Sequence, residues 1–120
     1  MTQARLALGS AGEALAAEHL EAAGYRILVR RWHAAGREID LVAERDGVIA
    51  LVEVKTRGPG ALASPLLAVD WRKQRQLAAA GAVAAARWKG PDRVFRFDVV
   101  SITWGPAGVV IDHLEDAFRP

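Results

Sequence analysis

The dipeptide Asp46-Gly47, set between two apolar runs, is the feature that most constrains the fold of this chain. Both central positions of a two-residue hairpin turn favour positive φ, which Asp and Gly tolerate, so the pattern predicts a tight antiparallel hairpin. The two runs are residues 38–45 and 48–55. The second is almost wholly apolar until its last residues, which is typical of a central strand that is covered on both faces.

The remaining pattern predicts two helices and three further strands around this hairpin. Alanine-rich residues 9–24 indicate a helix with Ser10 as its N-cap and Gly24 as its stop. A second alanine-rich stretch predicts a helix over residues 70–88. The expected strands are residues 25–32, 95–103 and 109–113, and the expected loop is residues 56–65. The order helix, three strands, helix, two strands predicts an α/β sheet covered by helices.

Composition places the chain among soluble globular proteins, with residues 1–120 as one domain. Hydrophobic residues make up 52% and charged residues 25% of the chain, which excludes a disordered protein. There is no cysteine, which excludes a disulfide scaffold, a thiolate metal site and a cysteine nucleophile. No apolar run reaches the roughly 18 residues of a membrane span, and the N-terminus lacks the pattern of a signal peptide. We therefore expect a cytoplasmic protein without a membrane partner.

The register of the predicted hairpin brings acidic side chains together. With a two-residue turn, Asp40 lies opposite Glu53 and Glu38 lies opposite Lys55, all on one face. Like charges in such positions destabilise a sheet unless they share a cation, and carboxylates suit Mg²⁺ or Mn²⁺. The Val54 carbonyl is an expected third ligand. Lys55 would orient or deprotonate a water and offset charge on a phosphoryl group.

The same residues also fit an ordinary structural role. Glu38 and Lys55 would then form a cross-strand ion pair, with Asp40 and Glu53 exposed at a sheet edge. Against this alternative, acidic groups at the end of an apolar central strand are costly unless they are paired or bind a metal. A register slip of one residue would cancel the metal hypothesis, because it moves one side of the pair to the other face.

Glu13 is a second acidic candidate with two interpretations. It shares a helical stripe with Ala17, Leu20 and Gly24, the stripe expected to face the sheet, so its carboxylate would reach the same metal site. Residues 10–13 also fit a capping box, in which Glu13 returns to the amide of the N-cap Ser10. Spacing alone favours the capping role.

Seven basic residues and a single acid lie between residues 71 and 96. Such a block can neutralise phosphates and bind nucleic acid in a salt-dependent way, while a solvated helix face is the other interpretation. The basic residues are Arg72, Lys73, Arg75, Arg87, Lys89, Arg93 and Arg96.

Several short motifs, taken together, resemble those of the bacterial YraN family over nearly the whole chain. They are Gly12-Glu13, residues 24–28, Glu-Ile-Asp-Leu-Val-Ala at 38–43, Val-Glu-Val-Lys-Thr-Arg at 52–57, Ser64-Pro65, Lys73, and residues 96–100 and 113–118. That family is similar to the restriction-endonuclease-like superfamily, whose signature is an acid on one strand and (Asp/Glu)-x-Lys on the next. The resemblance implies a central mixed β-sheet flanked by helices, in the order αβββαββ.

The resemblance also implies an activity and a site. The expected protein is a Mg²⁺- or Mn²⁺-dependent endonuclease that hydrolyses DNA phosphodiester bonds, acting on branched or single-stranded structures as a relative of archaeal Holliday-junction resolvases. Asp40, Glu53 and the Val54 carbonyl become the metal ligands, Lys55 the catalytic lysine, and Glu13 the helical acid that completes the site. The expected DNA contacts are Lys73, Arg72, Arg75 and Arg57.

Two positions depart from the family pattern, and other functions stay open. Arg31 and Arg37 stand where the family more often has asparagine and glycine. We expect neither to touch the four site residues, although Arg37 adjoins the site and would alter the approach of substrate. The rival functions are a non-catalytic nucleic-acid-binding module in DNA repair, recombination or uptake, and a structural protein whose acids form ion pairs. Cutting a symmetric junction needs two sites related by a two-fold axis, so a homodimer is a further hypothesis.

Overall fold

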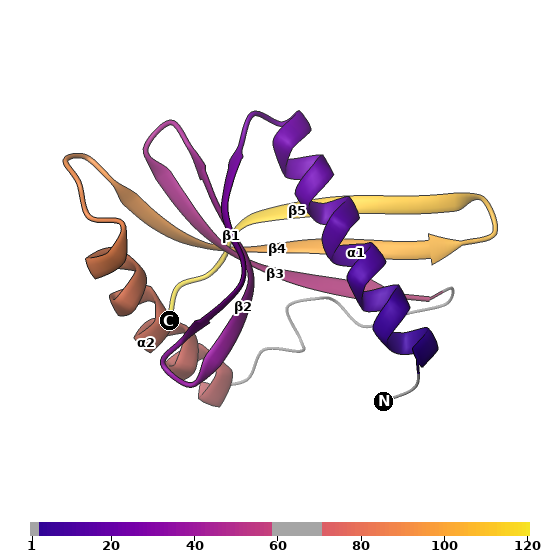
Figure 1. Ribbon diagram of the computed structural model, residues 1–120, viewed down its shortest axis with the longest axis horizontal. Helices are drawn as coiled ribbons and strands as arrows, with labels where there is room; N and C mark the ends of the chain where they lie inside the picture. Colours follow the sequence, from indigo (N-terminus) through magenta and orange to yellow (C-terminus); the bar gives the residue numbers. More distant parts are fainter. Residues whose placement is uncertain (1–2, 59–70) are drawn as a thin grey trace.

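The computed structural model describes the backbone of residues 3–58 and 71–120, and side chains for residues 11–58, 72 and 74–120 (Figure 1). Two helices and five strands make up this part of the chain. They are α1 (Gln3–Ala22), β1 (Arg26–Ala34), β2 (Arg37–Arg45), β3 (Val48–Arg57), α2 (Trp71–Arg87), β4 (Val94–Gly105) and β5 (Gly108–Phe118).

The five strands form one mixed sheet in the order β1-β2-β3-β4-β5. Strands β3 and β4 run parallel, and the other neighbouring pairs are antiparallel. A parallel pair needs a crossover connection, and α2 lies within it. β3 is the central strand, and its residues 49–53 are buried, as its apolar sequence predicts. The predicted α/β class, a mixed sheet flanked by helices, is confirmed.

The hairpin that joins β2 to β3 has the predicted turn. Asp46 and Gly47 both adopt positive φ, 51° and 81°, as a two-residue turn with right-handed strand twist requires. Pairing starts at Arg45 with Val48 and continues in the predicted register. A similar two-residue turn, which the sequence analysis did not identify, joins β1 to β2 through residues 35 and 36 at φ 53° and 74°.

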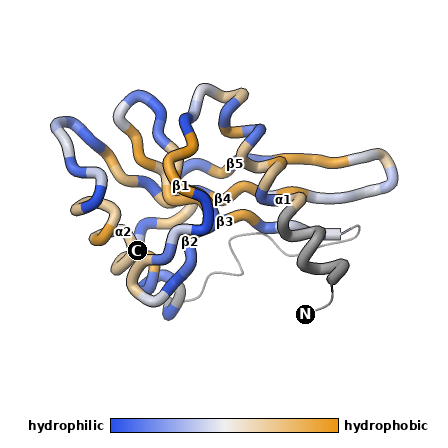
Figure 2. Tube along the Cα trace, viewed as in Figure 1, coloured by the Kyte–Doolittle hydropathy of each residue, from blue (hydrophilic) through white to orange (hydrophobic). Residues whose placement is uncertain are grey.

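Helices α1 and α2 cover opposite faces of the sheet and bury separate apolar clusters (Figures 1 and 2). The α1 face contains Ala16, Ala17 and Leu20 with Leu41, Ala43, Ala50, Val52, Val100 and Ile102. The α2 face contains Leu77, Ala80 and Ala84 with Ile39, Val42, Ile49 and Leu51. The small alanine side chains let each helix approach the sheet closely, while a fully buried leucine contributes roughly 1.5–3 kcal/mol. Among the described residues, no helix is both long and apolar enough to cross a membrane.

Three predicted boundaries are wrong: the start of the first helix, the end of the last strand, and the start of the expected loop, because Thr56 and Arg57 still belong to β3. Helix α1 begins at Gln3, so Ser10 lies inside the helix and is not its N-cap. The helix-forming residues 4–8 precede the weak formers Gly9-Ser10, and two weak formers do not end a helix whose later turns pack on the sheet. Strand β5 extends to Phe118 because it pairs with β4 along most of its length, with an irregularity between Phe97 and Val99. Residue 70 and most of the expected loop lie outside the described residues.

A buried charged network holds β5 against β4 and the start of β1. Asp98 is fully buried, and its carboxylate accepts hydrogen bonds from Arg96 at 2.7 and 2.8 Å and from the Asp116 amide at 3.0 Å. His113 Nε2 lies 2.8 Å from the same carboxylate, and Arg96 also donates to the Tyr25 hydroxyl at 2.6 Å. Burial alone would raise the pKa of Asp98, but these partners hold it below its usual value of 3.8.

Replacing Asp98 by alanine is expected to lower the free energy of unfolding by about 3–5 kcal/mol, because the substitution leaves the half-buried Arg96 guanidinium without the buried carboxylate that accepts two of its hydrogen bonds. Denaturant unfolding at pH 7 measures the change. The matched control is Asp112→Ala on the same hairpin, where the side chain is exposed and the expected change is within about 0.5 kcal/mol. Equal losses in the two variants would show that the network contributes nothing specific.

Candidate metal centre

The site lies where β2 and β3 part. The paired positions of these strands end at Leu41 and Val52, so Asp40 and Glu53 do not form the directly paired position that the hairpin register predicts. Instead, the Asp40 carboxylate accepts a hydrogen bond from the backbone N–H of Val54 at 2.7 Å. The side chain thus takes the place of a backbone carbonyl and fixes the carboxylate in the gap between the strands.

The backbone is distorted at the same point. Ile39 and Val42 both pack on the α2 face, whereas Leu41 packs on the α1 face, so the alternation of β2 breaks between residues 39 and 41. Across the β1–β2 register, Arg31 stands opposite Asp40 and has a φ of 52°. Positive φ in a non-glycine residue costs of order 1–3 kcal/mol and occurs preferentially at functional sites.

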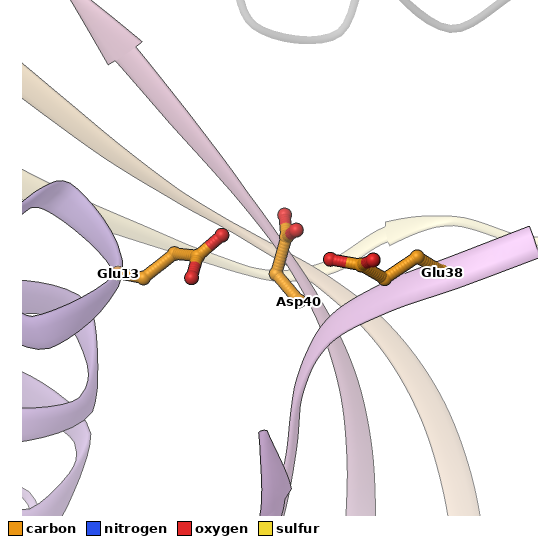
Figure 3. Close-up of side chains that lie close together, drawn as sticks. All are labelled: Glu13, Glu38 and Asp40. Atoms are coloured by element: carbon orange, nitrogen blue, oxygen red, sulfur yellow. The ribbon is translucent and has the colours of Figure 1, made fainter. Parts of the chain in front are cut away.

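Three carboxylates converge in this region, each offering one oxygen within 4.8 Å of the others. They belong to Glu13 on α1 and to Glu38 and Asp40 on β2, and Figure 3 shows Asp40 between the two glutamates. The close approach of α1 depends on Gly12, because a Cβ there would lie 2.3 Å from the Thr56 hydroxyl oxygen on β3. A glycine before Glu13 therefore lets the helix bring its acid to the sheet.

The role of Glu13 as a capping residue is excluded. Since α1 begins at Gln3, Glu13 lies in the middle of the helix, where no free backbone amide needs a cap. The predicted stripe is confirmed for Ala17 and Leu20, which are buried against the sheet, whereas Gly24 is exposed and lies beyond the end of α1. The Glu13 carboxylate instead accepts a hydrogen bond from Arg31 Nε at 3.0 Å.

Glu53 has a different environment from the three clustered acids. It is 7% exposed, and its Oε1 lies 2.6 Å from Arg37 Nη2. Arg37 also donates to Gln76 on α2 at 3.4 Å, which places this pair on the α2 face. The expectation that Arg31 and Arg37 touch no site residue is therefore wrong. Each pairs with one acid, on opposite sides of Asp40.

The predicted arrangement of four side chains on one face is also wrong. Val52 and Val54 pack on the α1 face, so strand alternation places Glu53 and Lys55 on the other face. Asp40 connects the two sides, because it bonds the amide that directly follows Glu53. Lys55 is half-buried. The acids thus surround a gap in the sheet rather than lining a single surface.

Burial and the neighbouring acids raise the pKa of Asp40. Burial raises the pKa of this carboxyl from 3.8 to about 6; the bond from the Val54 amide opposes the rise, and nearby Glu53 and Glu13 add to it. The group is thus held as an anion at pH 7 against an unfavourable environment. Perturbed carboxyls of this kind are characteristic of functional sites, and a bound cation would remove the penalty.

The ordinary structural alternative does not match the described contacts. Glu38 Oε2 lies 3.4 Å from His33 Nε2, and no ion pair with Lys55 is present among the described residues. Glu53 is buried and not exposed at a sheet edge, since β3 is the central strand. The specific cross-strand pair of Glu38 with Lys55 is therefore not found among the described residues. Glu53 and Glu38 contact Arg37 and His33 instead, and Asp40 is the acid that has no basic partner among the described contacts.

The basic block divides into inward and outward members. Arg96 bonds the buried Asp98, and Arg93 lies 3.5 Å from Glu44, so both serve the fold. Arg72 and Arg75 are exposed on α2, while the side chain of Lys73 lies outside the described residues. Arg57 ends β3 and is half-buried.

Sequence reasoning missed the partners of the acids, although one signal was present. Gly36 marks the turn between β1 and β2, and a two-residue turn there places Arg31 opposite Asp40. The pair between Arg37 and Glu53 had no comparable signal. Its two residues lie outside the paired part of β2 and β3.

Comparisons with known proteins give one consistent result. Residues 12–102 match the family described as "Uncharacterised protein family UPF0102". A UPF0102 protein of Geobacter metallireducens is 44% identical over 112 residues, covering 93% of this chain and 92% of that protein. One of Symbiobacterium thermophilum is 45% identical, covering 84% and 86%, and one of Nitratidesulfovibrio vulgaris is 40% identical, covering 98% and 88%.

Replacing Asp40 by asparagine is expected to stabilise the protein at pH 8 and to have little effect at pH 4. The folded state keeps the Asp40 proton up to about pH 6, whereas the unfolded chain loses it near pH 4. The charged carboxyl therefore lowers the free energy of unfolding progressively between pH 4 and 6, by at most about 3 kcal/mol above that range.

Urea unfolding without divalent cations at several pH values measures this effect. Asparagine keeps an oxygen that can accept the Val54 amide proton, so the charge is the main change. Asp112→Asn is the matched exposed control. A stabilisation by Asp40→Asn that is independent of pH would contradict the assignment.

Proposed function

We propose that this chain, which belongs to the uncharacterised protein family UPF0102 (the YraN family), is a restriction-endonuclease-like nuclease that hydrolyses DNA phosphodiester bonds with Mg²⁺ or Mn²⁺. The observation that carries this proposal is the convergence of the Glu13, Glu38 and Asp40 carboxylates within 4.8 Å, at a gap in a mixed sheet. The fold is compatible with the restriction-endonuclease-like plan, and the sequence has an acid on β2 followed by Glu-Val-Lys on β3.

The donor set fits a hard divalent cation. Mg²⁺ and Mn²⁺ prefer carboxylate, carbonyl and water oxygens, and Mg²⁺ commonly takes one or two protein carboxylates. Asp40 would supply the central ligand, because its carboxylate is fixed by the Val54 amide and has its pKa raised by burial and by neighbouring acids. Glu13 and Glu38 are close enough to share the same ion. Glu53 and the Val54 carbonyl are the further candidate ligands, on β3, and Glu53 would have to leave its bond with Arg37 to bind the ion.

When bound, the cation would supply Lewis acidity and make water a stronger nucleophile at neutral pH. The chain's own residues then orient the reactants. Lys55 follows Glu53 by two positions and shares its face, so its ammonium would orient the attacking water and offset negative charge on the phosphoryl group. The close packing of Gly12 against Thr56 would keep α1, and with it the Glu13 carboxylate, in place beside the sheet.

DNA would be held through its phosphates. Arg72 and Arg75 are exposed on α2, the same helix carries Lys73, and Arg57 lies at the end of β3. Such contacts fix the backbone in place without reading the base sequence, so we propose recognition of DNA structure, with branched or single-stranded DNA as substrate. A symmetric branched substrate would be cut by two protomers related by a two-fold axis.

One observation favours a second function, a non-catalytic DNA-binding module. Glu53 is buried and bonded to Arg37 at 2.6 Å, so one of the expected ligands already has a cation partner. In this alternative the arginines neutralise the acids permanently, and the protein binds DNA in repair, recombination or uptake without cutting it.

A cleavage panel distinguishes the two functions. Branched, single-stranded and duplex DNA and matching RNA are incubated with Mn²⁺, Mg²⁺ or EDTA. The nuclease proposal expects metal-dependent cutting of DNA that falls at least 100-fold in Asp40→Ala and Glu53→Ala, while DNA binding stays intact. Asp112→Ala is the control that should cut normally.

Two results would count against the nuclease proposal. Wild-type protein that binds DNA but cuts no substrate with either cation would establish the binding module. Cutting that survives in both Asp40→Ala and Glu53→Ala would place the active centre elsewhere.

A further inference from the structure

We propose that Arg37 is a phosphate-binding residue. In the metal-free protein its guanidinium bonds the Glu53 carboxylate, and when a divalent cation binds, it turns to a phosphate of the DNA backbone. The inference rests on the proposed function and extends it to a residue that the site does not otherwise use. Movement of the Arg37 side chain would make the binding of the cation and the binding of DNA cooperative.

The bonding of Arg37 is incomplete. Its side chain is 15% exposed, and Nη2 makes a short bond of 2.6 Å to Glu53. Nη1 makes only a long contact of 3.4 Å with Gln76, and the buried Nε has no hydrogen-bond partner among the described residues. A guanidinium offers five N–H donors, and buried donors are almost always satisfied. The Nε of Arg37 is therefore a buried donor that could bond an acceptor which the described residues do not supply.

The location of Arg37 points to phosphate as that acceptor. Gln76 lies four residues after Arg72 on α2, so the two side chains project from neighbouring turns of the same helix face. Arg75 is the residue before Gln76, and both arginines are exposed. A DNA backbone that contacts this part of α2 would come close to Arg37. A phosphate offers paired oxygens that match the guanidinium fork, so one group would satisfy more donors than the present contacts do.

Cation binding would release Arg37 from Glu53. A divalent cation on the Glu53 carboxylate repels a guanidinium on the same carboxylate and weakens its attraction. The freed Arg37 would then gain a phosphate partner. Because binding free energies are reciprocal, DNA would raise the affinity for the cation by the same factor that the cation raises the affinity for DNA.

Arg31 is not expected to act in this way. Its side chain is 56% exposed, and its ion pair with Glu13 is a surface pair of small free energy. Water can satisfy exposed donors, so Arg31 lacks the buried unpartnered nitrogen that distinguishes Arg37.

Two measurements on Arg37→Gln test the inference. Calorimetric titration with Mn²⁺ alone is expected to show at least threefold tighter binding than wild type, because the competing guanidinium is gone. The affinity for a fluorescent four-way DNA junction is measured with EDTA and with Ca²⁺, which takes similar oxygen ligands. The factor by which Ca²⁺ raises the affinity for DNA is expected to be at least fivefold smaller in Arg37→Gln than in the wild-type protein. Arg26→Gln, which removes a surface pair with Glu44, should leave both values unchanged.

A third measurement keeps the test decisive if Arg37→Gln folds poorly. The variant leaves Glu53 without a cation partner, so Mn²⁺ is expected to raise its melting temperature more than that of wild type. Arg37→Lys keeps the positive charge but not the forked guanidinium. Its affinity for DNA should lie between those of the wild-type protein and Arg37→Gln.

The outcomes separate this inference from the proposed function. If wild type binds Mn²⁺ but Arg37→Gln shows the same Mn²⁺ affinity, the same Ca²⁺ effect on DNA binding and the same Mn²⁺-induced rise in melting temperature, the role of Arg37 is overturned while the metal centre stands. If wild type binds no Mn²⁺, the metal centre and the role of Arg37 fail together.

Discussion

The hydrogen bond from the Val54 amide to the Asp40 carboxylate is the interaction on which the geometry of the candidate metal centre depends. It forms where the β2–β3 ladder stops, so a side-chain oxygen replaces the next backbone carbonyl. The carboxylate is thereby fixed inside a central sheet, with Glu13 and Glu38 on one side and Glu53 on the other.

Keeping four acids around one gap opposes folding, and the structure compensates for them unequally. Arg31 and Arg37 each neutralise one glutamate, while Asp40 relies on a backbone amide and has its pKa raised to about 6. Asp98, a comparable buried acid on β4, has its pKa lowered, because Arg96 and other donors surround it. The contrast shows that this fold can fully stabilise a buried carboxylate. The negative charge of Asp40 is only partly compensated by its neighbours, as expected of a carboxylate that binds a cation.

Local patterns predicted the elements, whereas long-range pairings decided their ends and partners. The turn at Asp46-Gly47 needs only its own φ preferences and the apolar runs beside it, so it was predictable. The start of α1 at Gln3 depends on packing of later turns, which local capping signals do not report. The contact of His113 with Asp98 and the Arg37–Glu53 pair join residues on different strands, and local sequence patterns do not report such contacts. The approach of Glu13 to Asp40 depended on Gly12, whose small size mattered only against Thr56.

The pH dependence of Mn²⁺ binding by the wild-type protein tests the central claim most directly. Because Asp40 must lose its proton to act as a ligand and its pKa is about 6, the affinity for Mn²⁺ should fall about tenfold between pH 7.5 and pH 5. Calorimetry in buffers of different ionisation enthalpy should also show a proton released on binding near pH 6. An affinity that is flat over this range, or an absence of binding, would contradict the account of the acids as a cation site.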